Sequence, residues 1–310
     1  MRRWLTLGLV STLLCAGFTQ HENDLLFGVQ DGALAVIQPQ PHPVRMMSSV
    51  FGAYLLDVGM DFYYDENGIP DLQSCRVVQR WITPGLIGRR SGIGNIFCES
   101  GCPNFFDLPT NGTPHHHFIF SVSAPGVYVW DCQAVNGIAS NGAPVADMPQ
   151  VYRIYMVAGN LAQVYGEVSP AQGYVGSLYD LMLTVSVRQS GQPIISQSLP
   201  PNPDAIYPYL VGFPRTGSAT LVAKLSKHLS RRINNFTLGG ATRVDWQFPY
   251  AGDLNGDDVI DDADLLAVLF AFGQTGSSLA EDVNGDGTVD DADLLTVLFN
   301  FGQVGEGSQP

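Results

Sequence analysis

Oxygen-bearing residues recur at a regular spacing near the end of the chain. In residues 253–264 they occupy positions 1, 3, 5, 7, 9 and 12 of a twelve-residue stretch. The set is Asp253, Asn255, Asp257, Val259 (through its backbone carbonyl), Asp261 and Asp264. Ca²⁺ is a hard cation that takes six to eight oxygen ligands, and a twelve-residue loop supplies them from these positions. The spacing therefore predicts a calcium-binding loop.

The same pattern occurs again 29 residues later. Residues 253–274 and 282–303 are identical at sixteen of 22 aligned positions, which indicates one supersecondary unit used twice. The second set of ligands is Asp282, Asn284, Asp286, Thr288 (backbone carbonyl), Asp290 and Asp293. Four carboxylates in each set repel one another unless a cation is bound, so folding and calcium binding should be coupled. We expect two Ca²⁺ ions.

Two further positions of the loops predict local geometry. Position 6 needs an unusual backbone turn, which Gly287 supplies in the second loop. Asp258 stands there in the first loop, and we expect slight strain because Asp tolerates the left-handed conformation less well than Gly. Ile260 and Val289 occupy position 8, where we expect the two loops to pair as a short antiparallel bridge.

A short helix is predicted after each loop. Apolar residues recur there at helical spacing, and a glycine follows each run as an expected helix end. These residues are Leu265, Leu266, Leu269, Phe272 and Gly273 in the first copy, and Leu294, Leu295, Leu298, Phe301 and Gly302 in the second.

Two such loops, each followed but not preceded by a helix, resemble a type I dockerin. The Asp at position 12 (Asp264 and Asp293) also matches that family. The resemblance implies a calcium-binding docking module that binds a cohesin-type protein, often in polysaccharide-degrading systems. This chain departs from many cellulosomal dockerins, because positions 10 and 11 are Asp-Ala and neither helix carries Lys or Arg. A stabilising calcium module without a cohesin partner therefore stays open beside a docking module.

Charge is unevenly distributed along the 310 residues. Residues 251–310 contain thirteen Asp or Glu and no Lys or Arg, whereas the other 250 residues contain sixteen acids and fifteen bases. An acidic surface without a basic patch disfavours a nucleic-acid partner.

The first residues predict export. Arg2 and Arg3 precede a short apolar run at residues 5–17, which is typical of a signal peptide covering residues 1–20. No later run of eighteen apolar residues occurs, so no transmembrane segment is expected. We expect a secreted protein, extracellular or at the cell surface.

Cysteine usage agrees with export. Four cysteines follow the predicted signal peptide, and an even number in an exported chain favours two disulfides with three alternative pairings. The candidates are Cys75, Cys98, Cys102 and Cys132. The alternative is a thiolate metal site that uses Cys98, Cys102 and nearby histidines.

A histidine run is the densest chemical cluster of the first half. If residues 115–122 form a strand, His115 and His117 share one face, roughly 6.6 Å apart along the strand, with His116 opposite. Two such imidazoles can bind one Zn²⁺ or Cu ion when one or two other ligands join them. His21, His42, Asp57 and Asp61 are available, and His21 is the candidate third ligand. The alternative is a polar junction whose histidines only face solvent.

The same residues resemble a group of bacterial surface-anchored proteins, some of which are under zinc-responsive control. The matching positions are His21, Gly32 to Leu34, His115, His117 and Pro125 to Tyr128. The usual His-x-Asp start is His21-Glu22-Asn23 here, which leaves the first ligand in question.

Short apolar or alternating runs between Gly, Pro and Asn dominate the rest of the chain. They predict a mainly β protein with two β-sandwich domains, at residues 21–159 and 160–249, followed by a small all-α dockerin-like domain at 251–304. The second segment resembles carboxypeptidase-regulatory or transthyretin-like sandwiches. His228, beside Arg231 and Arg232, is expected at a solvated strand end.

No sequence motif predicts catalysis. G-x-S-x-G, H-E-x-x-H and a P-loop are absent, and the acids between Asp57 and Asp71 are interpreted as an acidic loop. We therefore expect a non-catalytic protein without catalytic residues. The alternative is a dockerin-bearing polysaccharide-degrading component, either a glycosidase or a carbohydrate-binding module. Solvent-facing Trp81 and Trp130 would favour that alternative.

Overall fold

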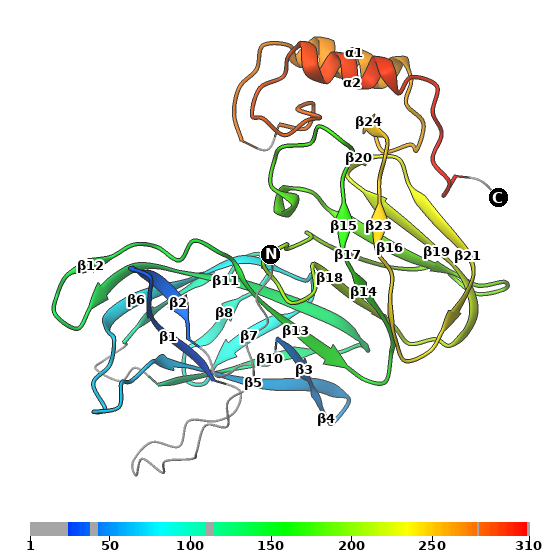
Figure 1. Ribbon diagram of the computed structural model, residues 1–310. Coiled ribbons are helices and arrows are strands. Elements are labelled where there is room, and N and C mark those ends of the chain that lie inside the picture. Colours follow the sequence, from blue (N-terminus) through cyan, green and yellow to red (C-terminus); the bar gives the residue numbers. More distant parts are fainter. Residues whose placement is uncertain (1–23, 38–42, 110–114, 278, 309–310) are drawn as a thin grey trace, which may run out of the picture.

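The chain folds as a mainly β protein, as the sequence predicts. The computed structural model describes residues 24–37, 43–109, 115–277 and 279–308. Within them, two β-rich units carry a pair of helices at one end of the molecule (Figure 1). Neither helix of this described part has the length and apolar character needed to cross a membrane.

The first unit consists of two sheets. The seven-stranded sheet has the order β2-β1-β5-β10-β7-β8, with β4 also pairing β5. Its strands are β1 Leu25–Gln30, β2 Ala33–Val36, β4 Ser48–Val50, β5 Ala53–Phe62, β7 Ile87–Arg90, β8 Gly94–Phe97 and β10 His116–Val122. The six-stranded sheet has the order β3-β13-β11-β6-β9, with β12 on β11. Its strands are β3 Val44–Met46, β6 Leu72–Ile82, β9 Phe105–Leu108, β11 Gly126–Ala139, β12 Pro144–Val145 and β13 Tyr152–Ala158.

Alternating side chains bury one face of each sheet. Phe118 and Phe120 of β10 point inward from the first sheet, and Trp130 and Ala134 of β11 point inward from the second. These residues are fully buried in one shared cluster. The predicted β-sandwich of this segment is therefore confirmed.

The second unit contains three small sheets. The four-stranded sheet has the order β17-β16-β19-β21, formed by β16 Leu183–Arg188, β17 Ile195–Leu199, β19 Gly217–Leu225 and β21 Arg231–Leu238. The three-stranded sheet has the order β18-β14-β22, formed by β14 Ala162–Gly166, β18 Tyr209–Phe213 and β22 Ala241–Arg243. β15 Val168–Ser169 pairs with β23 Trp246–Gln247, and η1 Leu178–Asp180 is a 3₁₀ turn. Val185, Leu221 and Val211 belong to the buried cluster that these sheets share.

The two β units are joined by buried contacts. Val129 and Tyr155, on the outer face of the six-stranded sheet, belong to the core of the second unit. Beside them Arg153 and Asp131 are cross-strand partners, and their side chains form a fully buried ion pair at 2.6 Å. Tyr179 of the second unit donates its hydroxyl to Asp131 at 2.8 Å. Buried apolar packing and a satisfied ion pair therefore hold the units together.

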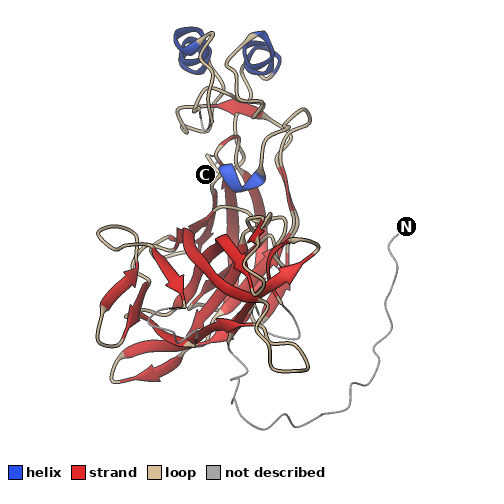
Figure 2. Cartoon of the chain, turned by 90° about the vertical axis from the view of Figure 1, so that its left-hand side faces the viewer, coloured by secondary structure: helices blue, strands red, loops and turns tan. Residues whose placement is uncertain are grey.

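The C-terminal segment contains the two predicted helices, α1 Asp262–Ala271 and α2 Asp291–Phe299, side by side in Figure 2. It is not entirely helical as predicted, because β24 Ala251–Asp253 pairs with β20 Lys227–His228 of the second unit. The expected pairing of Ile260 with Val289 is also wrong. Ile260 exchanges backbone hydrogen bonds with residues 302–303, and Val289 does so with residues 273–274. Each loop thus pairs with the segment that leaves the other repeat's helix.

Only one of the two predicted disulfides forms. Cys98 and Cys102 are bonded, so they do not form the alternative thiolate metal site, whereas Cys75 and Cys132 are free and buried. Cys132 pairs with Gln79 on β6, four residues from Cys75. That offset is roughly 13 Å along a strand, beyond the reach of a disulfide. Burial raises the pKa of the Cys75 thiol to about 12, which keeps it a neutral core residue.

Replacing Arg153 tests the joint between the two β units. Arg153→Met leaves Asp131 buried without its cation, which costs about 3–5 kcal/mol of unfolding free energy. Urea denaturation measures the loss. The control is Arg76→Met, which breaks the exposed Arg76–Asp107 pair and should shift the midpoint far less. Equal midpoints for the two variants would contradict this assignment.

Candidate calcium-binding module

The two predicted loops have nearly the same internal hydrogen bonds. Asp253 and Asp282, at position 1, accept backbone N–H groups from position 4 at 2.8 and 2.7 Å. Asn255 and Asn284, at position 3, each accept the N–H of position 5 at 2.9 Å. Short side chains that bond backbone two or three residues ahead favour this tight turn over continued strand or helix. The repeat in sequence is therefore a repeat in local structure.

Position 12 of each loop is also the third residue of the following helix. Asp264 accepts the N–H groups of Leu254 at 2.8 Å and Asp261 at 3.0 Å, and Asp293 makes the equivalent bonds in the second copy. Both helices thus begin with a capping box, which fixes where they start. Both carboxylates are fully buried. Burial raises the pKa of Asp293, and the negative charge of the nearby Asp282 raises it as well. Hydrogen bonds from three backbone N–H groups lower it in part.

Position 6 has the predicted backbone conformation in both loops, with φ of 74° at Asp258 and 88° at Gly287. The side chain of Asp258 also makes contacts outside its own loop. Its carboxylate accepts the N–H of Ser230 at 2.7 Å and that of Ser308 at 3.1 Å, and it lies 3.2 Å from Lys224 Nζ. The side chain therefore fastens the loop to β20–β21 and to the end of the chain. These contacts offset the backbone strain that the sequence predicts for a non-glycine residue at position 6.

The donor set fits Ca²⁺. Each loop offers oxygen donors only: four carboxylates, one side-chain amide and one backbone carbonyl. Within the described part of the chain no Lys or Arg forms a direct ion pair with a carboxylate of the second loop, and Lys227 approaches it through the carbonyl of Asp282. The carboxylates accept hydrogen bonds from N–H groups of their own loops. Within the described ranges, no group of three or more His, Cys, Asp or Glu side chains is arranged to hold a metal ion.

Two lysines, which the sequence analysis missed, connect the loops to the second β unit. Lys224 of β19 contacts Asp253 of the first loop. Lys227 of β20 donates to the carbonyls of Leu279 at 2.8 Å and Asp282 at 2.5 Å, beside the second loop. The sequence offered one signal for these contacts, the absence of Lys and Arg after position 250. Cationic side chains that offset the charge of the loops therefore had to come from earlier in the chain.

The helices expose most of their apolar side chains. The half-exposed or fully exposed residues are Leu266, Leu269, Phe270 and Phe272 in the first repeat, and Leu295, Leu298, Phe299 and Phe301 in the second. Phe270 is 84% exposed and Phe299 is 82% exposed. Val268 and Val297 instead fill the small core between the helices and loops. The helical spacing was predicted correctly. Leu265 and Leu294 pack against the small core, whereas the other predicted leucines and phenylalanines are exposed at equivalent positions of the two repeats.

The histidine candidates divide into two groups. His115 and His117 lie together, with their Nε2 atoms 2.8 Å apart, while His116 points into the sandwich and its ring lies edge-on to Phe106. This is the alternation that the sequence predicts for a strand. The third candidate, His21, lies outside the described residues.

The acidic residues between Asp57 and Asp71 have separate structural roles. Asp65 caps a turn by accepting the N–H groups of Asn67 and Ile69, and Asp71 accepts that of Val29. Asp57 and Asp61 instead contact the histidines. Both lie on strand β5, so the expected acidic loop is wrong for these two residues.

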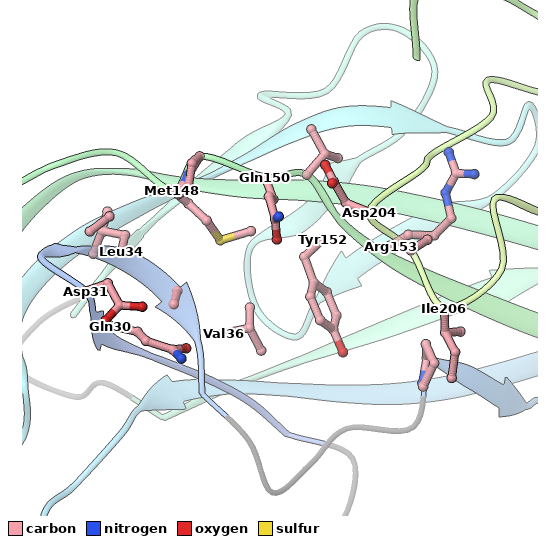
Figure 3. Close-up of a pocket in the computed structure, with 16 residues that line it drawn as sticks. Gln30, Asp31, Leu34, Val36, Met148, Gln150, Tyr152, Arg153, Asp204 and Ile206 are labelled. Atoms are coloured by element: carbon pink, nitrogen blue, oxygen red, sulfur yellow. The ribbon is translucent and has the colours of Figure 1, made fainter. Parts of the chain in front are cut away.

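A cleft of about 870 Å³ lies between the β1–β2 hairpin, the segment before β13 and residues 204–206 (Figure 3). Its charged lining residues are Asp31, Arg153 and Asp204, and Arg153 is engaged by Asp131. None of the residues that the sequence singled out as metal or disulfide candidates lines it.

Comparisons with known proteins give no family. No family model and no curated protein matches the chain. Two solved structures of interface mutants of the type II cohesin–X–dockerin complex from Acetivibrio cellulolyticus match at 21% and 20% identity, with TM-scores of 0.36 and 0.35. Each match covers 47% of this chain and 99% of the other. The Bacillus anthracis TIE protein matches at 7% identity and a TM-score of 0.23, over 74% of this chain and 42% of that one. TM-scores this low do not establish a shared fold.

His228 is buried at the joint with the calcium-binding module, and not solvated as predicted. Its Nε2 accepts the N–H of Ala171 at 3.1 Å, and its Nδ1 donates to the carbonyl of Ser226 at 2.8 Å. Burial lowers the pKa of His228 to about 4, and the positive charges of Lys224 and Lys227 also lower it. The hydrogen bond to Ser226 acts in the opposite direction and raises the pKa.

This lowered pKa predicts acid sensitivity. The unfolded chain binds a proton near pH 6.5 and the folded chain only near pH 4, so stability is complete above pH 6.5 and is lost as the pH falls through this window. The loss amounts to about 3 kcal/mol. An NMR titration of the His228 ring should show a neutral imidazole down to about pH 4. Protonation near pH 6.5 in the folded protein would contradict the assignment.

Proposed function

We propose that this chain is a secreted, non-catalytic modular protein whose C-terminal segment is a dockerin-type module. In this proposal two Ca²⁺ ions stabilise the module, and it docks onto a cohesin-type protein domain. The observation that carries the proposal is the pair of matching loop–helix units, which share internal hydrogen bonds, capping boxes and exposed apolar residues.

The calcium part rests on charge. Asp264 and Asp293 are fully buried, and Asp253 and Asp282 are nearly so. Burying carboxylates without a counter-ion is costly, and a divalent cation removes that cost while using the oxygens that the loops supply. The ligands would be the residues at positions 1, 3, 5, 7, 9 and 12 of each loop.

The docking part rests on the exposed apolar surface. Monomeric soluble proteins rarely expose large contiguous apolar patches without a binding role. Here Phe270 and Phe299, at equivalent positions of the repeat, are almost fully exposed. Aromatic side chains of this kind are the usual anchors of a protein interface. The module has no Lys or Arg, so a partner with basic residues around an apolar centre complements it best.

No observation favours the alternative, a carbohydrate-active domain. Trp130 is fully buried in the sandwich core, and Trp81 packs against the core of the second unit. A row of solvent-facing aromatic rings, which would bind sugars, is therefore not formed by these residues.

Removing calcium should loosen only the C-terminal module. Hydrogen exchange of the full chain with excess chelator should show faster exchange in α1 and α2 than with Ca²⁺, because bound ion stabilises the folded loops. At a hundredfold excess of calcium over its dissociation constant the difference is about 2.7 kcal/mol per site. Exchange in β5 and β11 serves as the internal control and should not change. Equal protection of both helices with and without chelator would refute the calcium role.

Replacing the exposed aromatic residues should abolish docking without unfolding the module. Phe270→Ser with Phe299→Ser removes two anchors, and we expect at least a hundredfold loss of affinity for a purified cohesin domain measured by calorimetry. Phe51→Ser is the matched control, because Phe51 is fully exposed on the first β unit. Unchanged affinity in the double variant, or no binding of wild type to a panel of cohesin domains, would remove the docking role and leave the calcium test untouched.

A further inference from the structure

A pair of histidines lies on the outer face of the seven-stranded sheet. β10 pairs with β5 so that His117 is opposite Gly59. Side chains alternate along a strand, so Asp57 and Asp61, two residues to either side of Gly59, share the face of His117. His115, the residue before β10, reaches the same face, and its ring centroid lies 4.7 Å from that of His117. Two imidazoles and two carboxylates are thereby collected on one surface.

Each imidazole is held by a carboxylate at its Nδ1 atom. His115 Nδ1 lies 3.1 Å from Asp61 Oδ2, and His117 Nδ1 lies 2.9 Å from Asp57 Oδ1. An ionised carboxylate only accepts hydrogen bonds, so each Nδ1 carries the proton. A neutral imidazole with that tautomer presents a lone pair on Nε2. The two Nε2 atoms face each other at 2.8 Å, and two lone pairs at that separation call for a cation between them.

A third carboxylate increases the negative charge beside the pair. Asp24 is buried, with Oδ2 3.8 Å from His115 Nδ1. Gly59 makes the space for it, because a Cβ at that position would lie 1.9 Å from Asp24 Oδ1. Three carboxylates therefore lie around the two imidazoles, and their negative charge favours a bound cation.

We propose that His115 and His117 bind one transition-metal ion, Zn²⁺ or Cu²⁺, through their Nε2 atoms. Asp57 and Asp61 are positioning residues, which fix the tautomer and orientation of each ring as carboxylates do behind histidine ligands of zinc. Tetrahedral coordination with bonds of 2.0–2.1 Å places two nitrogens about 3.3 Å apart, so the rings need to open by only about half an ångström. The site lies on the first β unit and does not depend on the proposed calcium module.

The full chain, saturated with Ca²⁺, is titrated with ZnCl₂ alone and then with CuCl₂ alone in a calorimeter. We expect one equivalent of metal to bind the wild type with an affinity at least a hundredfold above that of His117→Gln. Asp57→Asn should weaken binding tenfold to a hundredfold, because the ligand stays but its orienting partner is lost. Asp31→Asn is the matched control, since it removes one negative charge from an exposed turn of the same unit and should leave affinity unchanged.

Electron paramagnetic resonance of the copper-loaded protein gives a second readout. Hyperfine coupling to two nitrogens is expected in the wild type and to one nitrogen in His117→Gln. Thermal unfolding in the absence of metal checks that the variants fold. Equal uptake of zinc and copper by wild type and a folded His117→Gln would overturn the proposal, and the contact between the rings would then be a shared proton. Zinc-only or copper-only binding would support it and identify the metal.

Discussion

Crowding of carboxylates in two short loops is the constraint on which the C-terminal part of this protein depends. Each loop places four aspartates at ligand positions within twelve residues, and residues 251–310 contain no basic side chain to offset them. Backbone N–H groups take up part of the charge through turns and helix caps. Hydrogen bonds do not cancel the repulsion between buried carboxylates, so the loops need cations from outside their own sequence.

The second β unit supplies some of these cations and also anchors the module. Lys224 contacts the first loop, Lys227 bonds the carbonyls beside the second, and Asp258 ties the first loop to Ser230. On its other side the same unit shares a core with the sandwich, next to the buried pair of Arg153 and Asp131. The middle unit is therefore a structural link between the acidic loop–helix module and the β-sandwich.

The two candidate metal sites differ in their donor atoms. The C-terminal loops offer only oxygen donors, which suit Ca²⁺, whereas the sheet face offers two imidazole nitrogens, which suit Zn²⁺ or Cu²⁺. In the proposed calcium loops the carboxylates would be ligands themselves. At the histidine pair, Asp57 and Asp61 contact the Nδ1 atoms and would orient the rings from behind.

The sequence by itself determined the mainly β class, the two loop–helix repeats and their positive-φ positions, because these depend on local spacing and backbone sterics. It also placed His115 and His117 on one face, since alternation is a property of any strand. Only the tertiary structure decided which apolar helix residues are exposed, how the loops pair and which cysteines bond. These outcomes depend on strand register and packing between residues far apart in the chain. The same holds for the burial of His228 and for the contacts of Asp57 and Asp61 with the histidines, since β5 and β10 are paired strands that lie far apart in the chain.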